Sequence, residues 1–470
     1  MQTIQKSILL LIVAVLSFVY SYATEISIKD FGAKTEAPNN ALFIQKAIDF
    51  CSSRGGGTVY IPSGIYFSST IYLKDNVNLC LRQGAVIKAL ADPALYKDRG
   101  VVVGMNVENV AITGQGTVDG QGDHAKFQLG DNGGVRPHVV LFSGCRKARV
   151  EDVSLVNSAS WTLRLAYCDG VRVNNVFLFS HGNYNCDGID VSSKNVLISD
   201  CHIDCDDDGI CFKSEKEGYV VEHVVVNNCI ISSNCNGIKF GTGSIGGFQN
   251  IAISNCVIHK ASVDNIRKWQ SVIPGISAET TVLAGIALEV VDGGFMDQIT
   301  INNLSMQDVQ TPLFIRLGNR KGNGTLKNVI ISNIIAQSES LMTSSITGIP
   351  GHRVENVTVK DVIFKYRGGV KANDIPVTVP EKENSYPENR MFGPVLPAYG
   401  LYIRHADNLV LENIQCYLQS ADARPAFVFD DVHHLFLRNF RVSKPSGDGP
   451  IFYSKNCPDA VIDVPVLMND

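Results

Sequence analysis

Three segments in the middle of the chain repeat one pattern: KNVLISDC at residues 194–201, EHVVVNNC at 222–229 and QNIAISNC at 249–256. In each segment, apolar residues alternate with other residues, and Asn or Asp follows them. The first apolar position serves as an anchor, and equivalent anchors are Val171, Val196, Val224, Ile251, Ile299, Val329, Val357, Leu409 and Leu435. Most anchors are 25–30 residues apart, and two steps, of 48 and 52 residues, are nearly twice as long.

This pattern predicts a β-solenoid. Alternation of apolar residues is typical of strands, and a period of 25–30 residues without a helical segment is typical of stacked coils. Each long step indicates either an insertion or a coil that lacks the pattern. Before the coils, residues 41–52 place apolar side chains at helical spacing, and we expect a short helix that caps the open end of the solenoid.

Three cysteines of the repeat are predicted to be buried thiols that act as small apolar side chains. The position five residues after each anchor holds Val176, Cys201, Cys229, Cys256, Leu304, Ile334, Val362, Ile414 and Phe440. Three consecutive coils therefore have cysteine at a position that holds larger apolar residues in the other coils. Cysteine can act there as a small hydrophobic side chain. The chain has thirteen cysteines, so at least one thiol has no partner within the chain.

The first residues are typical of an export signal. Lys6 precedes an apolar run at residues 8–19, and Ser-Tyr-Ala at 21–23 resembles a cleavage site. We expect residues 1–23 to be a signal peptide and residues 24–470 a single domain that is secreted or periplasmic. The run is too short for a membrane span, and a net charge of −5 argues against a nucleic-acid partner. We expect a monomer.

Two acidic motifs are the candidate site. Residues 185–190 read Asn-Cys-Asp-Gly-Ile-Asp, and Asp206, Asp207 and Asp208 follow one coil later. Repelling carboxylates are costly to bring together, so their clustering suggests acid–base chemistry or cation binding. Two alternatives remain open: the motifs form turns between coils, or their oxygens bind calcium.

The chain resembles the polygalacturonase-like glycoside hydrolases of family 28. The resemblance lies in Asp-Phe-Gly-Ala-Lys at 30–34, the Gly-rich segment at 114–122, Asn-Cys-Asp-Gly-Ile-Asp at 185–190 and the Asp-rich segment at 203–214. It implies an all-β, right-handed parallel β-helix that hydrolyses pectic polysaccharides with inversion. It also implies that Asp207 is the general acid, and that Asp187 and Asp208 hold and deprotonate the attacking water. Asp187 and Asp207 are 20 residues apart, which fits neighbouring coils.

Two motifs of that family are missing. Asn236 stands where the family has histidine, and Ala287, Leu288 and Glu289 align with its Arg-Ile-Lys. A carboxylate at Glu289 would repel the carboxylate of a uronic acid. In an alternative alignment, Arg267 and Lys268 supply the missing cations. The rhamnogalacturonan hydrolases of the family also lack the histidine, so the departures concern the substrate more than the hydrolysis.

We assign eight residues to substrate binding. They are Asn185, Lys213, Asn236, Lys239, Glu289, Arg316, Arg404 and His405. Trp161 and Tyr402 are candidates for stacking on sugar rings. The Pro-rich segment at 373–401 is predicted to be a long loop beside the cleft, and an enzyme whose groove it closes at one end would release sugars from chain ends.

The sequence thus predicts an exported, inverting glycoside hydrolase that acts on polygalacturonan or rhamnogalacturonan without a metal or cofactor. Two other functions are compatible with the fold. One is a glycan-binding β-helix without activity, and the other is a polysaccharide lyase, which would use a basic residue and calcium.

Overall fold

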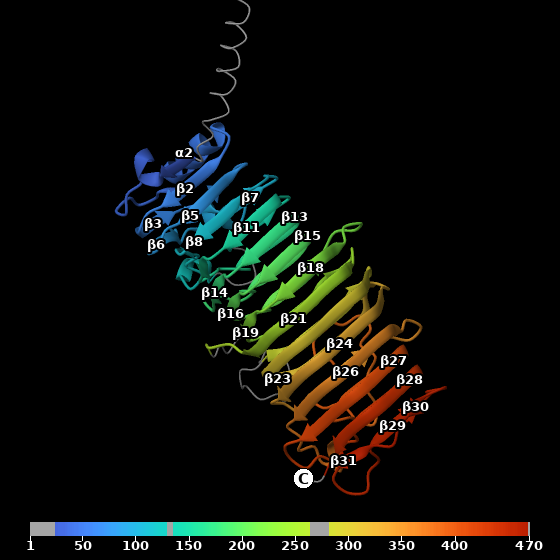
Figure 1. Ribbon diagram of the computed structural model, residues 1–470. Helices are drawn as coiled ribbons and strands as arrows, with labels where there is room; N and C mark the ends of the chain where they lie inside the picture. The colour runs from blue at the N-terminus through green and yellow to red at the C-terminus, as the bar shows by residue number, and fades with distance from the viewer. Residues whose placement is uncertain (1–23, 129–134, 264–281, 469–470) are drawn as a thin grey trace, which may run out of the picture.

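The computed structural model describes residues 24–128, 135–263 and 282–468, which form one long stack of parallel strands (Figure 1). The predicted signal peptide, and Arg267 and Lys268, lie outside the described residues. Strands from the N-terminal third lie at one end of the stack and β27 to β31 at the other. The predicted parallel β-helix is therefore confirmed.

The strands of the first half have the following bounds: β1 Thr24–Ser27, β2 Gly57–Ile61, β3 Gly64–Ser68, β4 Ile71–Tyr72, β5 Val77–Leu81, β6 Ala85–Ala89, β7 Gly100–Met105, β8 Ala111–Gly114, β9 Thr117–Asp119, β10 His138–Ser143, β11 Arg146–Glu151, β12 Ser154–Val156, β13 Leu163–Asn174, β14 Phe177–Ser180, β15 Ile189–Ser199, β16 His202–Cys205 and β17 Ile210–Ser214. Short 3-10 helices lie at Ile28–Phe31, Pro93–Leu95, Ala125–Phe127 and Ala372–Asp374.

The strands of the second half are β18 Val221–Asn227, β19 Ile230–Ser233, β20 Asn236–Ser244, β21 Phe248–Lys260, β22 Val282–Asp292, β23 Phe295–Gly322, β24 Thr325–Ser338, β25 Ser344–Thr347, β26 Val354–Tyr366, β27 Leu401–Leu418, β28 Phe427–Ser443, β29 Phe452–Lys455, β30 Val461–Ile462 and β31 Val466–Met468. Between β26 and β27, residues 367–400 form a long connection whose one regular element is a 3-10 turn.

The anchors of the repeat pair directly with one another, coil upon coil. Val171 pairs with Val196, Val196 with Val224, and Val224 with Ile251. Across the two long steps, Ile251 pairs with Ile299 and Val357 with Leu409. The extra residues of both steps are therefore insertions between strands of consecutive coils, and not coils that lack the pattern.

The residue after each run of alternating apolar positions explains why Asn and Asp recur. Asn255, Asn303 and Asn333 all have φ of 56°, a left-handed conformation that Asn tolerates better than most residues. Their side chains also form a ladder, since Asn303 donates to Asn255 at 3.1 Å and Asn333 to Asn303 at 3.2 Å. The repeated Asn thus turns the chain and ties neighbouring coils together.

The cysteine prediction is also confirmed. Cys201, Cys229 and Cys256 are each at most 2 % exposed and lie in the continuous apolar core. None of the thirteen cysteines, all of which lie within the described residues, forms a disulfide. These three stack in neighbouring coils, where each acts as a small apolar side chain.

The N-terminal helix, α2, spans Ala41–Ser53. It buries Ile44, Ala47, Ile48 and Cys51, the face that the sequence indicates, and it packs against β1, β2, β4 and β5 at one end of the stack (Figure 1). Among the described residues, no helix is both long and apolar enough to cross a membrane.

Candidate active site

One ladder of turns supplies the candidate acids. Ile189 in β15 pairs with Ile210 in β17, which pairs with Ile238 in β20. Asp187, Asp208 and Asn236 each lie two residues before these isoleucines. Three successive coils therefore present polar side chains at the same point of the turn, which is how motifs far apart in sequence meet.

Asp207 and Asp208 can face the same side because the backbone leaves the strand there. They lie between the end of β16 at Cys205 and the start of β17 at Ile210. The next residue, Gly209, approaches the following coil so closely that a Cβ would lie 2.7 Å from the carbonyl oxygen of Gly237. A side chain at Gly209 would push the coils apart, so this turn depends on glycine.

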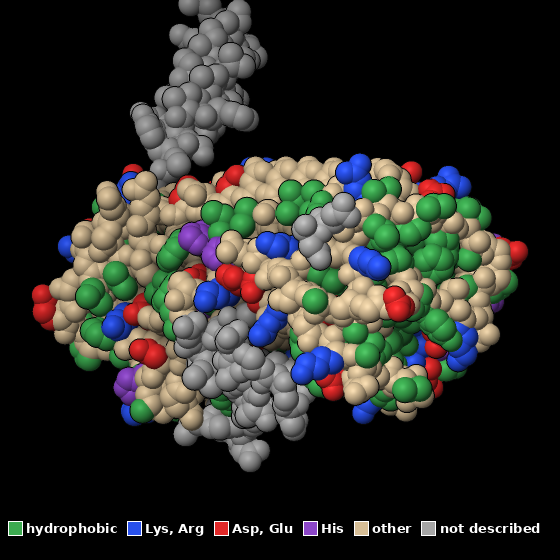
Figure 2. Space-filling view, turned by 90° about the horizontal axis from the view of Figure 1, so that it is seen from below, with side chains coloured by type: hydrophobic (Ala, Val, Ile, Leu, Met, Phe, Trp, Pro, Cys, Tyr) green, Lys and Arg blue, Asp and Glu red, His purple; other side chains and the backbone are tan. Residues whose placement is uncertain are grey.

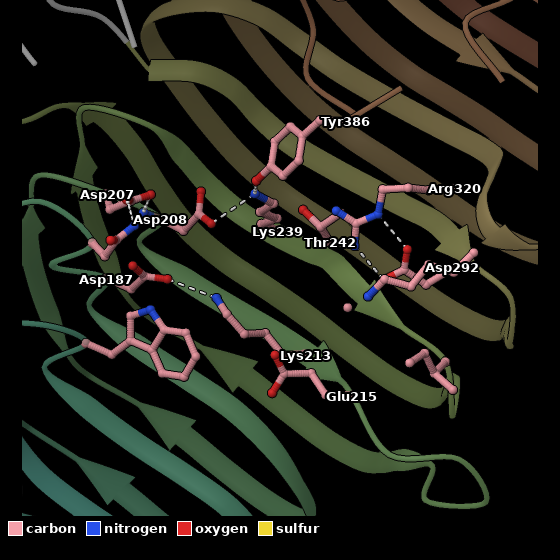
Figure 3. A pocket seen from close by; sticks show the side chains of 15 residues that line it. Asp187, Asp207, Asp208, Lys213, Glu215, Lys239, Thr242, Asp292, Arg320 and Tyr386 are labelled. Atoms are coloured by element: carbon pink, nitrogen blue, oxygen red, sulfur yellow. Dashed lines mark hydrogen bonds and ion pairs between the residues drawn. The ribbon is translucent and has the colours of Figure 1, made fainter. Parts of the chain in front are cut away.

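These carboxyl groups line an open cleft of about 330 Å³. Acidic and basic side chains lie side by side near the middle of this face (Figure 2). The lining includes the carboxyl groups of Asp187, Asp207, Asp208, Glu215 and Asp292, the cations of Lys213, Lys239, Arg320 and Lys321, and the rings of Trp161 and Tyr386 (Figure 3). The cleft is thus polar and contains charges of both signs.

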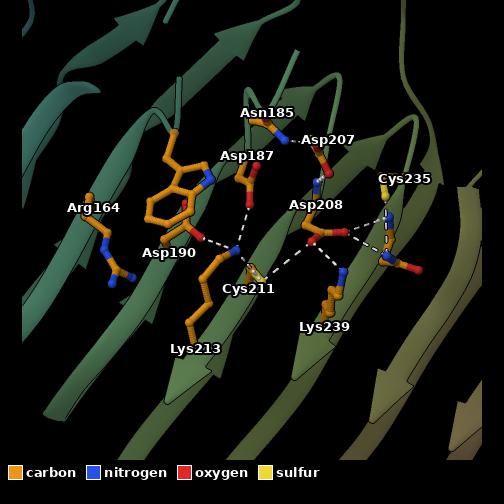
Figure 4. A network of polar contacts seen from close by, with 12 residues as sticks. Arg164, Asn185, Asp187, Asp190, Asp207, Asp208, Cys211, Lys213, Cys235 and Lys239 are labelled. Carbon is orange, nitrogen blue, oxygen red and sulfur yellow. Dashed lines mark hydrogen bonds and ion pairs between the residues drawn. The ribbon is translucent and has the colours of Figure 1, made fainter. Parts of the chain in front are cut away.

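Two lysines bind the acids (Figure 4). The Lys213 ammonium lies 2.9 Å from Asp187 Oδ2 and 2.7 Å from Asp190 Oδ1. The Lys239 ammonium lies 3.1 Å from Asp208 Oδ2. Asp208 Oδ1 also accepts a hydrogen bond from Asn236 Nδ2 at 2.7 Å. The acids are therefore held in fixed positions rather than free in solvent.

The pKa values of the two adjacent acids are pushed apart. Burial, and then the charge of Asp208, raise the pKa of Asp207 from 3.8 to about 6. Burial also acts to raise the pKa of Asp208, but Lys239, Lys213 and the Asn236 hydrogen bond outweigh it and lower this pKa to about 2. Between these values Asp207 carries a proton and Asp208 a charge.

Asp187 and Asp190 share the single ammonium of Lys213. Burial and the mutual repulsion of the two carboxylates raise the pKa of Asp187 well above its usual value, against the attraction of Lys213. Burial likewise raises the pKa of Asp190. Their attraction in turn raises the pKa of Lys213, against its burial, so this lysine stays charged.

Two groups of donors could in principle hold a metal ion: Asp187, Asp190 and Cys211, and Asp207, Asp208 and Cys235. Lys213 lies within 3.0 Å of a donor atom of every residue in the first group. Lys239 contacts Asp208 in the second. In both groups a lysine ammonium already supplies the positive charge that a calcium ion would bring.

The structure places the other predicted substrate-binding residues in three settings. Asn185, Lys213 and Lys239 line the cleft. Asn236 and Glu289 lie beneath it: Asn236 is turned toward Asp208, and Glu289 is 1 % exposed. Burial raises the pKa of Glu289 to about 8, so at neutral pH it bears a proton and does not repel a uronate as the sequence suggested.

Arg316, Arg404 and His405 are a correction to the sequence-based assignment, because they hold the 367–400 connection instead of lining the cleft. Arg316 donates to the carbonyl oxygens of Glu381 and Lys382 at 2.8 and 3.1 Å. Arg404 donates to those of Val379 and Pro380 at 2.8 and 3.0 Å. His405 contacts Asp431 at 2.6 Å and Glu381 at 3.3 Å.

Several lining residues were not assigned from the sequence. Arg320 forms a two-pronged ion pair with Asp292 at 2.6 and 2.5 Å. Tyr386, in the long connection, lies with its ring 5.7 Å from the Lys239 ammonium and 5.8 Å from the Arg320 guanidinium. The Pro-rich composition indicated a loop beside the cleft, but no local signal could show which of its side chains enters the cleft.

Trp161, a candidate for sugar stacking, does line the cleft. It lies two residues before Leu163, which pairs with Ile189, and therefore extends the ladder of Asp187 by one coil. The Lys213 ammonium lies 4.7 Å from its ring centre. Tyr402, the other candidate, is 2 % exposed and packs in a separate apolar cluster.

Residues 51–380 match the family model described as glycosyl hydrolases family 28. The chain belongs to this family. It is therefore a glycoside hydrolase, as the resemblance implied.

Relatives and solved structures agree with this assignment. An exopolygalacturonase of Platanus acerifolia is 24 % identical over 378 residues, which cover 74 % of this chain and 92 % of that protein. A probable rhamnogalacturonase A of Aspergillus oryzae is 27 % identical over 254 residues, 52 % of this chain and 48 % of that protein. The fold is similar to that of a Thermotoga maritima exopolygalacturonase, with TM-score 0.63, 21 % identity and coverage of 83 % and 92 % of the two chains.

Proposed function

We propose that this protein is an exported hydrolase that cleaves glycosidic bonds of pectic polysaccharides with inversion. The observation that carries the proposal is the pair of adjacent carboxyl groups in one cleft, Asp207 protonated and Asp208 ionised, with Asp187 beside them. Two carboxyl groups whose surroundings push their pKa values apart are the usual acid and base of a glycosidase.

In this mechanism the proton of Asp207 passes to the oxygen of the glycosidic bond as that bond breaks. A water molecule held by Asp187 and Asp208 attacks the anomeric carbon from the opposite face and gives up a proton to one of these two carboxylates. One glycosidic bond is lost and one hydroxyl is gained on each fragment, with inverted configuration at the anomeric carbon. Lys213 and Lys239 hold the two carboxylates in place.

The proposed substrate is a backbone of polygalacturonan or rhamnogalacturonan type. The names of the relatives support it, and so do the cations of Arg320 and Lys321 in the cleft, which suit an acidic sugar. The family's cations at 287 and 289 are replaced by Ala and Glu, and the lining cations come from other positions instead.

We further propose that the enzyme trims chain ends. The 367–400 connection is fixed over the stack by Arg316 and Arg404, and it brings Tyr386 to the cleft between two cations. A held loop at one end of a groove favours binding of a chain terminus over the middle of a polymer. Residues 24–470 would act as one exported domain.

A lyase fits this cleft less well. Its chemistry removes a proton from the sugar carbon and needs a neutral base. Both lysines are ion-paired, and the neighbouring aspartates raise the pKa of each well above its usual value despite burial. They therefore remain protonated and make poor bases.

Incubation with defined oligogalacturonides and rhamnogalacturonan oligosaccharides tests the proposal. We expect saturated products of inverted anomeric configuration by NMR, released from one end, and a loss of about 10²–10⁴ in rate for Asp207→Asn. Products that absorb in the ultraviolet would indicate a lyase. Binding without cleavage would indicate a glycan-binding protein, and full activity of Asp207→Asn would remove this residue as the acid.

A further inference from the structure

Asp207 and Asp208 are neighbours in sequence, yet their surroundings differ. Asp208 Oδ1 accepts hydrogen bonds from Asn236 Nδ2 at 2.7 Å and from the Asn236 backbone N–H at 3.3 Å. Its other oxygen lies 3.1 Å from the Lys239 ammonium. Among the described residues, Asp207 makes no ion pair, and its side chain contacts Asn185 Nδ2 at 3.4 Å, the backbone N–H of Asp208 at 2.9 Å and the Cys235 thiol.

Both partners of Asp208 come from β20, in the coil that follows it. Asn236 occupies the same turn position as Asp208, one coil further on. Lys239 lies three residues later and pairs in register with Cys211 on one side and Ala287 on the other. Because Ala287 is short, the strand beyond offers no cation of its own at this level.

The Lys239 side chain has little freedom to leave. It is 6 % exposed, its ammonium lies 3.5 Å from the Tyr386 hydroxyl, and the ring of Tyr386 lies 5.7 Å away. Glu289 in β22 is buried, and burial raises its pKa to about 8. Among the described residues, the ion-pair partner of Lys239 is Asp208.

We propose that Asn236 and Lys239 are positioning residues that fix Asp208 as the ionised member of the adjacent acid pair and so leave the proton on Asp207. This inference rests on the proposed function for the roles of the two acids. It gives Asn236, which stands where the family has histidine, a neutral role in supporting the base, and it assigns Lys239 to the enzyme's own acid rather than to the substrate.

The physical reason is that two adjacent carboxyl groups cannot both ionise cheaply in a buried site, so whichever has the better partners takes the charge. Two N–H donors and one ammonium all act on Asp208. The other charged or titratable groups near it are Asp207, Asp187, Asp190, Lys213, Cys211, Cys235, Glu289 and Tyr386. Lys213, the cation among these groups, is ion-paired to Asp187 and Asp190.

The test compares Lys239→Gln and Asn236→Ala with the wild-type enzyme. Asp208 then loses its ammonium or its amide donor, so the pH below which kcat/KM falls should rise by about one unit or more for Lys239→Gln, and by less for Asn236→Ala. The matched control is Lys194→Gln, which breaks a lysine–glutamate pair of 2.7 Å with Glu222 outside the cleft lining and should leave the profile unchanged.

A second measurement needs no substrate and so separates this inference from the proposed function. With ¹³C-labelled aspartate carboxyl groups, the NMR signal missing from Asp208→Asn identifies Asp208, and its titration midpoint should rise in both variants. Unchanged midpoints and an unmoved acid limb, with activity lost equally at every pH, would overturn the proposal. An increase in KM alone would also overturn it, since Lys239 would then act on the substrate.

Discussion

Two regions of the molecule bury charged side chains and use them in opposite ways. In the cleft, Asp187 and Asp190 share one lysine, while Asp207 lies beside the ionised Asp208 without a cation of its own among the described residues. Under the 367–400 connection, Arg316 and Arg404 donate to fixed backbone carbonyls. The first arrangement leaves charge unbalanced and protons available, and the second stabilises a loop.

The ring of Phe392 shows how complete the second arrangement is. It belongs to the same connection and lies 5.4 Å from the Arg316 guanidinium and 5.7 Å from that of Arg404. Both arginines therefore hold the loop through carbonyl oxygens and through an aromatic face. Arg404 also pairs with Glu381 of the connection at 3.1 Å. The comparison teaches that the segment to which its partners belong decides whether a buried cation near the cleft holds the acids or holds the loop.

The largest expected effect separates the two regions by activity. Asp208→Asn and Asp187→Asn should each lower kcat by about 10²–10⁴, because the water loses its base or its holder, while each variant stays folded at the assay temperature. The measurement is initial hydrolysis rate beside a thermal melt. A variant that is already unfolded at the assay temperature would show that its acid has a structural role.

The second prediction concerns the loop. Arg404→Met keeps most of the side-chain volume but leaves two carbonyl oxygens without their donor, at a cost of about 1–3 kcal/mol for each buried group left unsatisfied. Limited proteolysis should therefore cut within residues 375–390 at least about tenfold faster. Arg438→Met, at an exposed arginine, is the control. Equal cleavage of the two variants would mean that Arg404 does not hold the loop.

The sequence predicted the fold well because a solenoid repeats one local rule. Each anchor, such as Val196 or Val224, pairs with its counterpart in the next coil, and the alternation that reveals a strand also fixes its register. The acidic motifs were equally easy to recognise in the sequence, because Asp187 and Asp208 occupy one turn position of successive coils.

The rest of the site depends on segments that the repeat does not describe. Arg316 and Arg404 lie in strands at the level of the cleft residues, and the sequence cannot show that a later insertion covers their side chains. Tyr386 is part of that insertion. The sequence assigned Lys239 to substrate binding, and its contact with Asp208 depends on side-chain packing that the repeat does not describe.

The smallest expected effect is on stability, and its sign differs between the regions. Burial and Asp208 raise the pKa of Asp207 to about 6 in the folded protein, above its ordinary 3.8. The folded state therefore retains a proton that the unfolded state has lost, and stability falls as pH rises from about 4 to 6. Asp207→Asn removes this loss, so it should melt at a higher temperature than the wild type at pH 8, with a smaller difference at pH 4.

For Asp431, burial is outweighed by Arg353 and His405, which lower its pKa. Its contribution is present above the ordinary pKa and is lost as pH falls, so Asp431→Asn should melt lower than the wild type at pH 8 and approach it in acid. Calorimetry at both pH values checks the pair, and shifts of the same sign in both variants would contradict the contrast between Asp207, which costs stability, and Asp431, which supplies it.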